Sequence, residues 1–175
     1  MKAFRQNPDI KTLIQLIAQT ELLCKEPFDH HQYTIASTLG YLYRIYGFDD
    51  MNQLIKAEMY FNRCLAYATS EKDIAKEITT RIRLGEVYKY QGNHQKALEL
   101  FQKAVLLCEA SDAKNQLDFA YQHLGKCLME MGRYNEAQAV LRLALALRKQ
   151  KDNQDLIDST IKALTLNNFY IENES

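Results

Sequence analysis

A repeat of forty residues constrains the fold of this chain more than any other feature of its sequence. The motif Leu84-Gly85-x-x-Tyr88, Gly92, Ala97, Phe101 and Ala104 returns forty residues later as Leu124-Gly125-x-x-Leu128, Gly132, Ala137, Leu141 and Ala144. A fixed period of this length is typical of a stacked array of helical units, each of which buries its apolar face against its neighbours. The repeat therefore predicts an all-α array of antiparallel helix pairs.

The composition agrees with long helices. Two prolines and six glycines in 175 residues leave little of the turn chemistry that many short strands would need. The length suffices for one domain, or for about four helical hairpins. Helical spacing of apolar residues predicts about eight helices in a single domain 1–175: an N-terminal helix over 8–27, a degenerate repeat over 29–69, repeats over 72–111 and 114–151, and a capping helix over 154–171.

The degenerate repeat keeps the residue types of the motif but changes their spacing. It contains Leu39-Gly40-x-x-Tyr43, Gly47, Ala57, Phe61 and Cys64. Ala57, Ala97 and Ala137 are evenly spaced, whereas the first helix of this copy lies five residues early. We therefore expect an enlarged loop around residues 48–53.

These residues resemble the tetratricopeptide repeat family over roughly residues 30–171. The segment 84–104 is similar to a near-consensus copy of that repeat, although the usual period is 34 residues. Longer variants occur in peptide-sensing bacterial regulators and in adaptor proteins such as the kinesin light chain. The resemblance implies a right-handed superhelix in which the first helix of each pair lines a concave groove.

The same resemblance implies which residues face that groove. They are Tyr41, Arg44, Ile82, Glu86, Lys89, Tyr90, Phe119, Gln122, Lys126, Met129 and Lys162. Such a surface, mixed in charge and rich in aromatic and apolar groups, suits a peptide segment or helix that anchors by apolar side chains and is oriented by a few ion pairs. The leading hypothesis is a protein–protein interaction module.

Two sub-types of the family can be compared with this sequence. Members that grip the C-terminal carboxylate of chaperones use a cluster of basic residues and asparagines, but the corresponding places here hold Ser37, Tyr41, Ile82, Glu86, Gln122 and Lys126. Chaperone-tail binding is therefore not expected. Peptide-sensing regulators often present groove asparagines, and this chain offers only Asn167 and Asn168 near its end.

The capping helix carries more apolar residues than a cap needs. Leu166, Phe169 and Tyr170 form a patch beside the predicted core stripe of Ile157, Ile161 and Leu164. A terminal helix of an array normally shows water a polar outer face. The patch indicates that the helix covers the groove, meets a second copy in a homodimer or docks on a partner; a merely apolar cap is the plain alternative.

Motifs for catalysis, metals and nucleic acids do not emerge. None of His30, His31, His94 and His123 has a second histidine or a carboxylate at i+4, and the chain lacks GxSxG, GxGxxG and P-loop motifs. We expect no enzyme activity, metal or cofactor. The basic run Arg142, Arg148, Lys149 and Lys151 is explained by the dipole at a helix C-terminus.

Charge and cysteine usage indicate a cytoplasmic protein without nucleic-acid or membrane partners. Acidic and basic residues balance at 22 each, and no apolar stretch approaches the roughly 18 residues that a membrane span needs. Cys24, Cys64, Cys108 and Cys127 lack CxxC spacing, which favours small, reduced, packed thiols. Two alternatives to the interaction module stay open: a peptide-sensing regulatory domain that switches conformation, and a scaffold that self-associates through its last helix.

Overall fold

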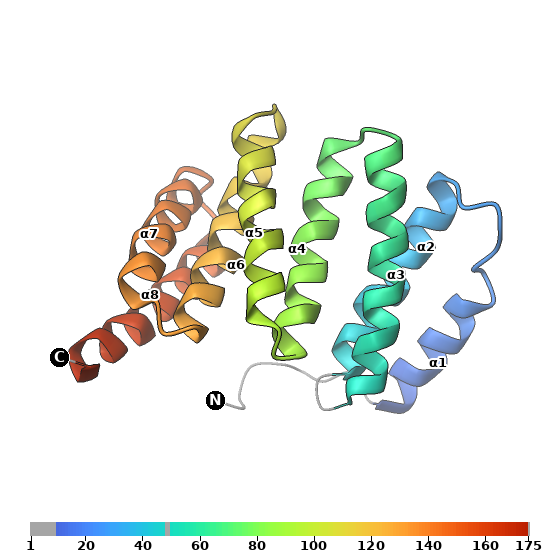
Figure 1. Ribbon diagram of the computed structural model, residues 1–175, viewed down its shortest axis with the longest axis horizontal. Helices are drawn as coiled ribbons and strands as arrows, with labels where there is room; N and C mark the ends of the chain where they lie inside the picture. Colours follow the sequence, from blue (N-terminus) through green and yellow to red (C-terminus); the bar gives the residue numbers. More distant parts are fainter. Residues whose placement is uncertain (1–9, 48–49, 175) are drawn as a thin grey trace. The chain divides into compact units, whose positions relative to one another are not determined.

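The computed structural model describes residues 10–47 and 50–174, and within them it contains eight α-helices and one short 3-10 helix (Figure 1). The helices are α1 (Ile10–Glu21), α2 (His30–Tyr46), α3 (Met51–Ser70), α4 (Ile74–Tyr90), α5 (His94–Glu109), η2 (Ala113–Gln116), α6 (Leu117–Glu130), α7 (Tyr134–Gln150) and α8 (Gln154–Glu174). The predicted all-α class and number of helices are confirmed. The predicted start at residues 8 and 9 lies outside the described residues, as does part of the enlarged loop around 48–53.

The chain divides into two compact units. Met1–Glu71 contains α1, α2 and α3, and Lys72–Ser175 contains α4 to α8. Within the first unit α2 packs on α3, and within the second α4 packs on α5 and α6 on α7. Each predicted repeat is thus one helix pair, and the prediction of a single domain over 1–175 stays a prediction.

A glycine on the first helix of each pair lets the two helices approach closely. A Cβ atom added at Gly85 would lie 2.5 Å from Cε1 of Phe101, and one added at Gly125 would lie 2.6 Å from Cγ of Leu141. Phe101 and Leu141 are both fully buried. The leucine-glycine motif therefore marks the crossing point at which one helix receives the large side chain of its partner.

The degenerate pair has the same crossing despite its altered spacing. A Cβ atom at Gly40 would lie 2.8 Å from Cε1 of Phe61, which is also fully buried. The five additional residues between the two motif positions therefore leave the α2–α3 contact equivalent to the contacts in the second unit.

Small residues complete the core of the second unit. Ala97, Ala104 and Ala137 are fully buried and join Ile78, Phe101, Cys108, Ala120, Leu124, Cys127 and Leu128 in one apolar cluster. Apolar residues at helical spacing on α4 to α7 account for this cluster, as the repeat predicts. Burial on one stripe of each helix leaves the opposite sides free for other interactions.

The tight turns in the second unit follow one backbone pattern. Gly92 and Gly132 take φ angles of +77° and +74°, the left-handed region that glycine adopts without steric cost. The residue after each turn begins the next helix. Asn93 accepts a hydrogen bond from the amide of Lys96 at 3.2 Å, whereas Arg133 at the corresponding position makes no side-chain cap.

The first helix ends earlier than predicted. α1 stops at Glu21, well before Pro27. The side chain of Gln32 pairs with two backbone groups of the following loop. It accepts a hydrogen bond from the amide of Lys25 at 2.7 Å and donates one to the carbonyl of Leu23 at 3.2 Å. Because these backbone groups form hydrogen bonds with a side chain, they do not need helical partners, and the helix ends before it reaches Pro27.

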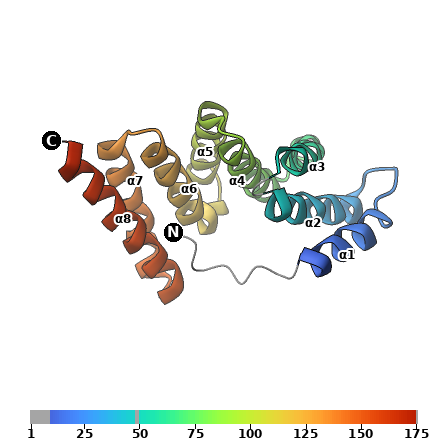
Figure 2. The ribbon, with the colours of Figure 1, turned by 90° about the horizontal axis from the view of Figure 1, so that it is seen from below.

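The buried side of the last helix differs from the predicted one. α8 packs on α7 (Figure 2), and it buries Ile157, Thr160, Ala163 and Asn167, while Ile161 is 44% exposed. The predicted core position of Ile161 is wrong. The Nδ2 atom of Asn167 donates to the carbonyl of Tyr134 at 3.0 Å, so a polar bond helps to set the rotation of α8.

The described helices include none that could cross a membrane, since none is both long enough and apolar enough.

Candidate functional site

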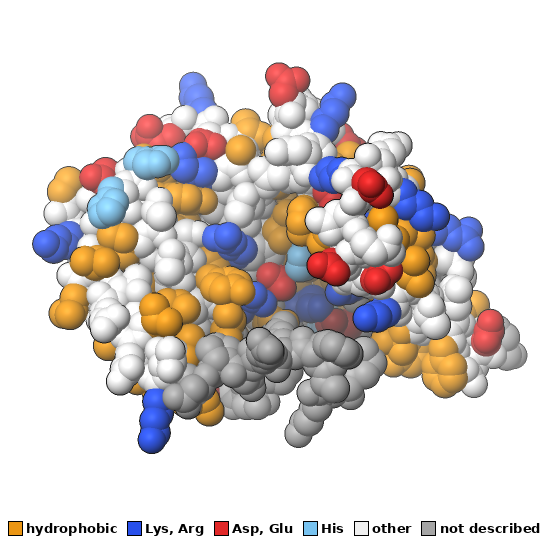
Figure 3. Space-filling view, turned by 180° about the vertical axis from the view of Figure 1, so that it is seen from behind, with side chains coloured by type: hydrophobic (Ala, Val, Ile, Leu, Met, Phe, Trp, Pro, Cys, Tyr) orange, Lys and Arg blue, Asp and Glu red, His pale blue; other side chains and the backbone are white. Residues whose placement is uncertain are grey.

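The first helices of the second unit bring most of the predicted groove residues together. α6 contacts both α4 and α8, and we call the side of these helices that carries the predicted residues the first-helix face. Of those residues, Phe119 and Lys162 are exposed, Glu86, Lys89, Tyr90, Lys126 and Met129 are half-buried, and Ile82 and Gln122 are buried. Seen from the side opposite to Figure 1, charged side chains of both signs and histidines lie among hydrophobic ones (Figure 3).

Ion pairs connect α4 and α6 across this face. Lys89 donates to Glu130 at 2.5 Å, and Nε2 of His94 lies 3.3 Å from the other carboxylate oxygen of Glu130. One turn away, Nδ1 of His123 lies 3.9 Å from Glu86. The ring of His94 therefore links the start of α5 to the end of α6.

Phe119 presents an aromatic surface at one end of α6. Its side chain is 40% exposed, and the guanidinium carbon of Arg148 and the Nζ atom of Lys151 lie 5.3 Å and 6.0 Å from the ring centre. Two cations close to one ring hold it in place by cation–π attraction. An apolar anchor for a ligand is thus available beside positive charge.

Gln122 and Lys126 lie one helical turn apart on the same side of α6. Gln122 is 3% exposed, and neither its amide nitrogen nor its amide oxygen has a hydrogen-bond partner among the described residues. Burial lowers the pKa of Lys126, and the nearby positive charges of Lys89 and Arg148 lower it further. Gln122 is thus a buried amide without a hydrogen-bond partner among the described residues, whereas Lys126 is a half-buried cation that the carboxylates of Glu86 and Glu130 also influence.

The groove residues predicted in the first unit have a different setting. Tyr41 on α2 is 43% exposed, and the guanidinium carbon of Arg44 lies 5.1 Å from the centre of its ring. Arg44 itself is only 7% exposed. Ile82 in the second unit is likewise 7% exposed and belongs to the apolar core. Tyr41 therefore offers surface to a ligand, whereas Arg44 and Ile82 offer little.

A buried ion pair joins α6 to α7 and was not foreseen from the sequence. Nε of Arg148 donates to Asp118 at 3.1 Å, with both side chains almost completely buried. Arg148 also donates to Oγ1 of Thr160 on α8 at 2.8 Å, and Lys151 bonds the second oxygen of Asp118. Two members of the basic run thus compensate a buried carboxylate, which the helix-dipole interpretation did not include. The thirty-residue spacing between Asp118 and Arg148 carries no local signal that could have revealed the pair.

The two asparagines near the end of the chain serve helix packing. Asn167 is fully buried and bonds the backbone of Tyr134, and Asn168 accepts a 2.7 Å hydrogen bond from Gln138. Both contacts fasten α8 to α7. Neither asparagine therefore stands ready to hold a peptide backbone.

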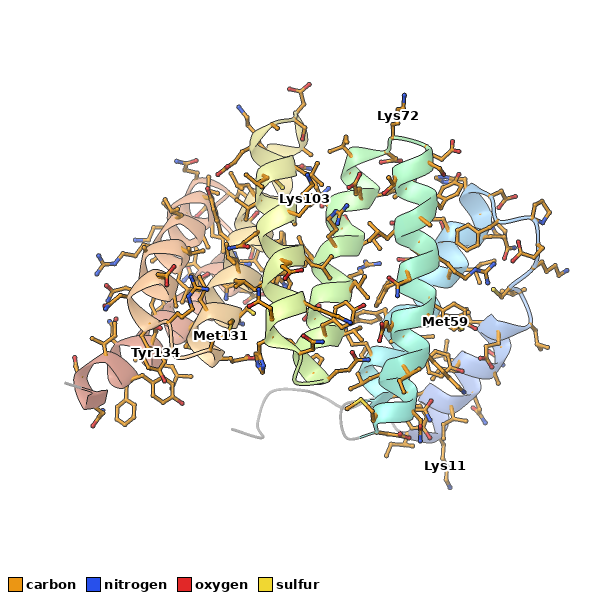
Figure 4. All side chains as sticks on the ribbon, viewed as in Figure 1. Lys11, Met59, Lys72, Lys103, Met131 and Tyr134 are labelled. Atoms are coloured by element: carbon orange, nitrogen blue, oxygen red, sulfur yellow. The ribbon has the colours of Figure 1, made fainter. Side chains whose placement is uncertain are left out.

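The predicted patch on α8 is aromatic and partly exposed. Phe169 and Tyr170 are 58% and 37% exposed, while Leu166 is half-buried. The ring of Tyr170 stacks on Tyr134 with centres 5.2 Å apart, and Phe169 meets Tyr170 edge-on. Figure 4 shows Tyr134 beside Met131, at the turn that leads into α7.

The four cysteines are free thiols, and Cys64, Cys108 and Cys127 are buried. Burial raises the pKa of Cys108 and of Cys127 to about 11 in each case. Thiols of such high pKa hold little reactive thiolate at neutral pH, as packed structural cysteines do. In the part of the chain that the structure describes, no three His, Cys, Asp or Glu side chains gather in a way that could hold a metal ion.

A protein-family model described as tetratricopeptide repeat matches residues 34–110 and, overlapping with them, residues 76–150. A search of curated proteins gives no match.

Solved structures similar to this one share its fold at low sequence identity. The apo form of RapI has a TM-score of 0.78 and 19% identity over 96% of this chain. BtubC (BKLC) from P. vanneervenii has a TM-score of 0.75 and 17% identity, covering 95% of this chain and 68% of its own. A kinesin light chain from Podosopora anserina with TPR-like repeats has a TM-score of 0.67 and 16% identity, covering 94% of this chain and 77% of its own. This chain spans 60% of the length of the RapI chain.

Proposed function

Since the chain belongs to the tetratricopeptide repeat family, we propose that it is a protein–protein interaction module that holds a peptide segment or a helix of a partner on its first-helix face. The fold of this family supports protein interaction in general. The observation that carries the more specific proposal is the exposed ring of Phe119, with the cations of Arg148 and Lys151 near it, on the helix layer that also carries the ion pair between α4 and α6.

This combination of groups suits a protein ligand. An aromatic ring that is fixed in place and still 40% exposed can receive an apolar side chain at little cost in conformational entropy. The pair Lys89–Glu130 and the contact His123–Glu86 lie further along the same two helices and can reorient to meet charges of the partner. Apolar anchoring and charge-based orientation are thus available on one side of one helix layer.

Photo-crosslinking tests the location of the binding surface. Replacing Phe119 by the photoreactive analogue p-benzoylphenylalanine is expected to yield crosslinked partner in cell extracts, whereas the same replacement at Leu106, 58% exposed on α5, is expected to yield none. Equal crosslinking from both positions, or crosslinking from Leu106 alone, would refute binding at the first-helix face.

A variant of three residues provides the complementary loss-of-binding test. Replacing Lys89, Phe119 and Lys126 together should abolish recovery of the crosslinked partner while the helical circular dichroism spectrum persists. Unchanged recovery would exclude this surface as the site. A change in helix packing on partner binding, measured by hydrogen exchange, would favour the regulatory alternative over a passive module.

Self-association through α8 is a second candidate. It is supported by the exposed rings of Phe169 and Tyr170 and by Ile161, which is 44% exposed on the same helix. Exposed apolar groups clustered on a terminal helix are typical of contact surfaces.

A further inference from the structure

The first and last described helices each expose a row of side chains at the spacing of one helical turn. Thr165 on α8 lies forty residues after Gly125, the position at which α6 receives the large side chain of its second helix. On α8 this position is exposed, and Ile161 and Phe169, one turn to either side, are 44% and 58% exposed. Because residues four apart lie on the same side of a helix, these three side chains form one open row, which we call the α8 row.

α1 carries an open row with the same spacing. Ile10 and Ile14 are 60% and 44% exposed, and Ala18 is exposed as well. Leu22 continues the row just beyond the helix, where it is 79% exposed and its amide still donates to the carbonyl of Ala18. α1 packs on α2 and buries Leu13 on an adjoining side, so this row, the α1 row, stays open. The end helices of an array normally show water a polar side, so two open apolar rows in one chain point to a contact.

The two rows belong to helices with complementary roles in the repeat. α8 occupies the place of a first helix, like α4 and α6, whereas α1 directly precedes the first helix α2, as the second helices α3 and α5 precede α4 and α6. In the complete pairs a glycine on the first helix faces a large side chain on the second, as Gly125 faces Leu141. Thr165 takes more space than glycine, so a helix that crosses α8 there must bring a small side chain. Ala18 in the α1 row is such a residue.

Charge distinguishes α1 from a second α8 as the partner of α8. α1 contains one basic and one acidic residue, Lys11 and Glu21. α8 contains one basic residue and four acidic ones, namely Lys162, Asp155, Asp158, Glu172 and Glu174. Two α8 helices in contact would therefore bring two acidic sets together, and like charges at a contact oppose association. α1 brings no such excess of negative charge.

An antiparallel register brings matching residues of the two rows together. When Ala18 is placed opposite Thr165 and the two helices run antiparallel, as in the other pairs, the rows stay in step because both have a period of four residues. The residues that then face each other are Leu22 with Ile161, Ile14 with Phe169, and Lys11 with Glu172. The last of these contacts joins opposite charges at exposed positions. Figure 4 shows Lys11 at the beginning of α1, pointing away from the other helices of its unit.

We propose that the α1 row of one copy docks on the α8 row of a second copy, so that α1 takes the place of a second helix beside α8. This inference extends the second candidate function, self-association through α8, and names the surface that α8 meets. Because the two rows are different surfaces, the contact is heterologous. A complex of two copies therefore keeps one free α1 row and one free α8 row, to which further copies can add.

A mixture of two blocked variants tests this contact. Ile14→Asp places a charge in the α1 row and Phe169→Asp places one in the α8 row, both at exposed positions where the helical circular dichroism spectrum should persist. In sedimentation velocity we expect the wild-type chain to associate with rising concentration and each variant alone to be monomeric. An equimolar mixture should form a complex of twice the 20.4 kDa chain mass and nothing larger. The reason is that the Phe169→Asp copy keeps its α1 row, the Ile14→Asp copy keeps its α8 row, and no other pair of intact rows remains.

Controls and a charge exchange sharpen the test. Leu106→Asp, at a 58% exposed position of α5, is the matched control and should associate as the wild-type chain does. Ile10→Asp provides a second block of the α1 row if Ile14→Asp alters the fold. Lys11→Glu should weaken association about fivefold, the size expected when an exposed ion pair becomes a pair of like charges. Adding Glu172→Lys to the same chain should restore the affinity, and an affinity that stays low would refute the antiparallel register.

Other results would overturn the proposal. A wild-type chain that stays monomeric at every concentration excludes both this contact and the second candidate function. Association that Phe169→Asp abolishes and Ile14→Asp leaves unchanged would refute docking by α1 and keep the second candidate. Two monomeric variants that fail to combine would also refute head-to-tail docking. Crosslinking from Phe119, measured in the monomeric Phe169→Asp chain, tests the binding of a partner separately from all these outcomes.

Discussion

At the scale of single residues, the glycines at the helix crossings are the positions least able to change. Gly85 lies under the ring of Phe101, and a Cβ atom there would come within 2.5 Å of Cε1. At such a distance the buried ring or the helix itself must move. The corresponding residue of α8 is Thr165, which is exposed, so no helix of the described chain crosses α8 at this point.

We predict that Gly85→Ala lowers the free energy of unfolding by about 1–3 kcal/mol, because the cost of overpacking exceeds the gain in helix propensity of about 1 kcal/mol. Urea denaturation followed by circular dichroism measures the change. Thr165→Ala is the matched control and should shift stability by only a few tenths of a kcal/mol. A stabilised Gly85→Ala variant would contradict the close crossing.

Lys126 is a second residue whose environment predicts a measurable effect. Burial and neighbouring cations lower its pKa in the folded protein, so folding disfavours the charged ammonium. We predict that Lys126→Met raises the melting temperature near pH 7. The unfolded state binds more protons, so wild-type stability rises with pH from the lowered folded pKa to the ordinary lysine value near 10.4. The advantage of the variant should therefore shrink over that window.

Melting curves at pH 7 and at pH 10 for both proteins check this sign. An advantage that grows with pH would mean that Lys126 is stabilised in its charged form.

At the scale of elements, the helix starts of the second unit differ in how well they are capped. Asn93 caps α5 through the amide of Lys96, while Arg133 at the start of α7 makes only an exposed pair with Glu136. We predict that Asn93→Ala costs about 1 kcal/mol. Arg133→Asn should raise the melting temperature by about 2 °C, because it supplies the missing cap.

Thermal unfolding of the two variants is the measurement. Asn135→Ala, an exposed change inside the first turn of α7, is the control and should have a small effect. The prediction requires that Asn93→Ala lowers the melting temperature and that Arg133→Asn raises it. A loss of stability in Arg133→Asn would show that the ion pair of Arg133 with Glu136 stabilises the protein more than a helix cap does.

The attachment of α8 depends on the buried ion pair between Asp118 and Arg148. Arg148 bonds both Asp118 on α6 and Thr160 on α8, and its side chain is 3% exposed. Arg148→Met leaves the Asp118 carboxylate with Lys151 alone, and we predict a loss of about 3 kcal/mol. The amides of α8 should lose hydrogen-exchange protection before those of α5.

Arg142→Met, which removes an exposed arginine from the same helix, is the control and should leave protection in α8 unchanged. The double variant Asp118→Leu with Arg148→Met should cost less than Arg148→Met alone, since no unpaired charge remains buried. A larger loss in the double variant would mean that the pair contributes net stability.

At the scale of the whole molecule, the aromatic patch on α8 bears on whether the chain is a monomer or a dimer. If Phe169 and Tyr170 meet a second copy, light scattering at micromolar concentration will give twice the mass of one 20.4 kDa chain. Phe169→Ser should then give a monomer, whereas Leu143→Ser, at a 49% exposed position of α7, should not. A monomeric wild-type chain removes the self-association candidate.

The repeat alone was sufficient to predict the helix pairs, their number and their crossing glycines. A glycine and a large apolar residue recur at fixed spacing because the two helices of every pair cross closely at the same position. The spacing of these residues along the chain therefore predicts the crossing. The helix caps at Asp29 and Asn93 are equally local, so they too can be read in the sequence.

Only the tertiary structure decided which polar groups are buried and which of them lack partners. Asp118 meets Arg148 across thirty residues, Asn167 turns inward to Tyr134, and Gln122 is enclosed without a hydrogen bond. The helical period assigns a residue to a side of its helix, but the burial and pairing of a polar side chain depend on the neighbouring helices. The sequence by itself therefore determined the array of helix pairs, and the three-dimensional packing decided which polar side chains are buried and paired within it.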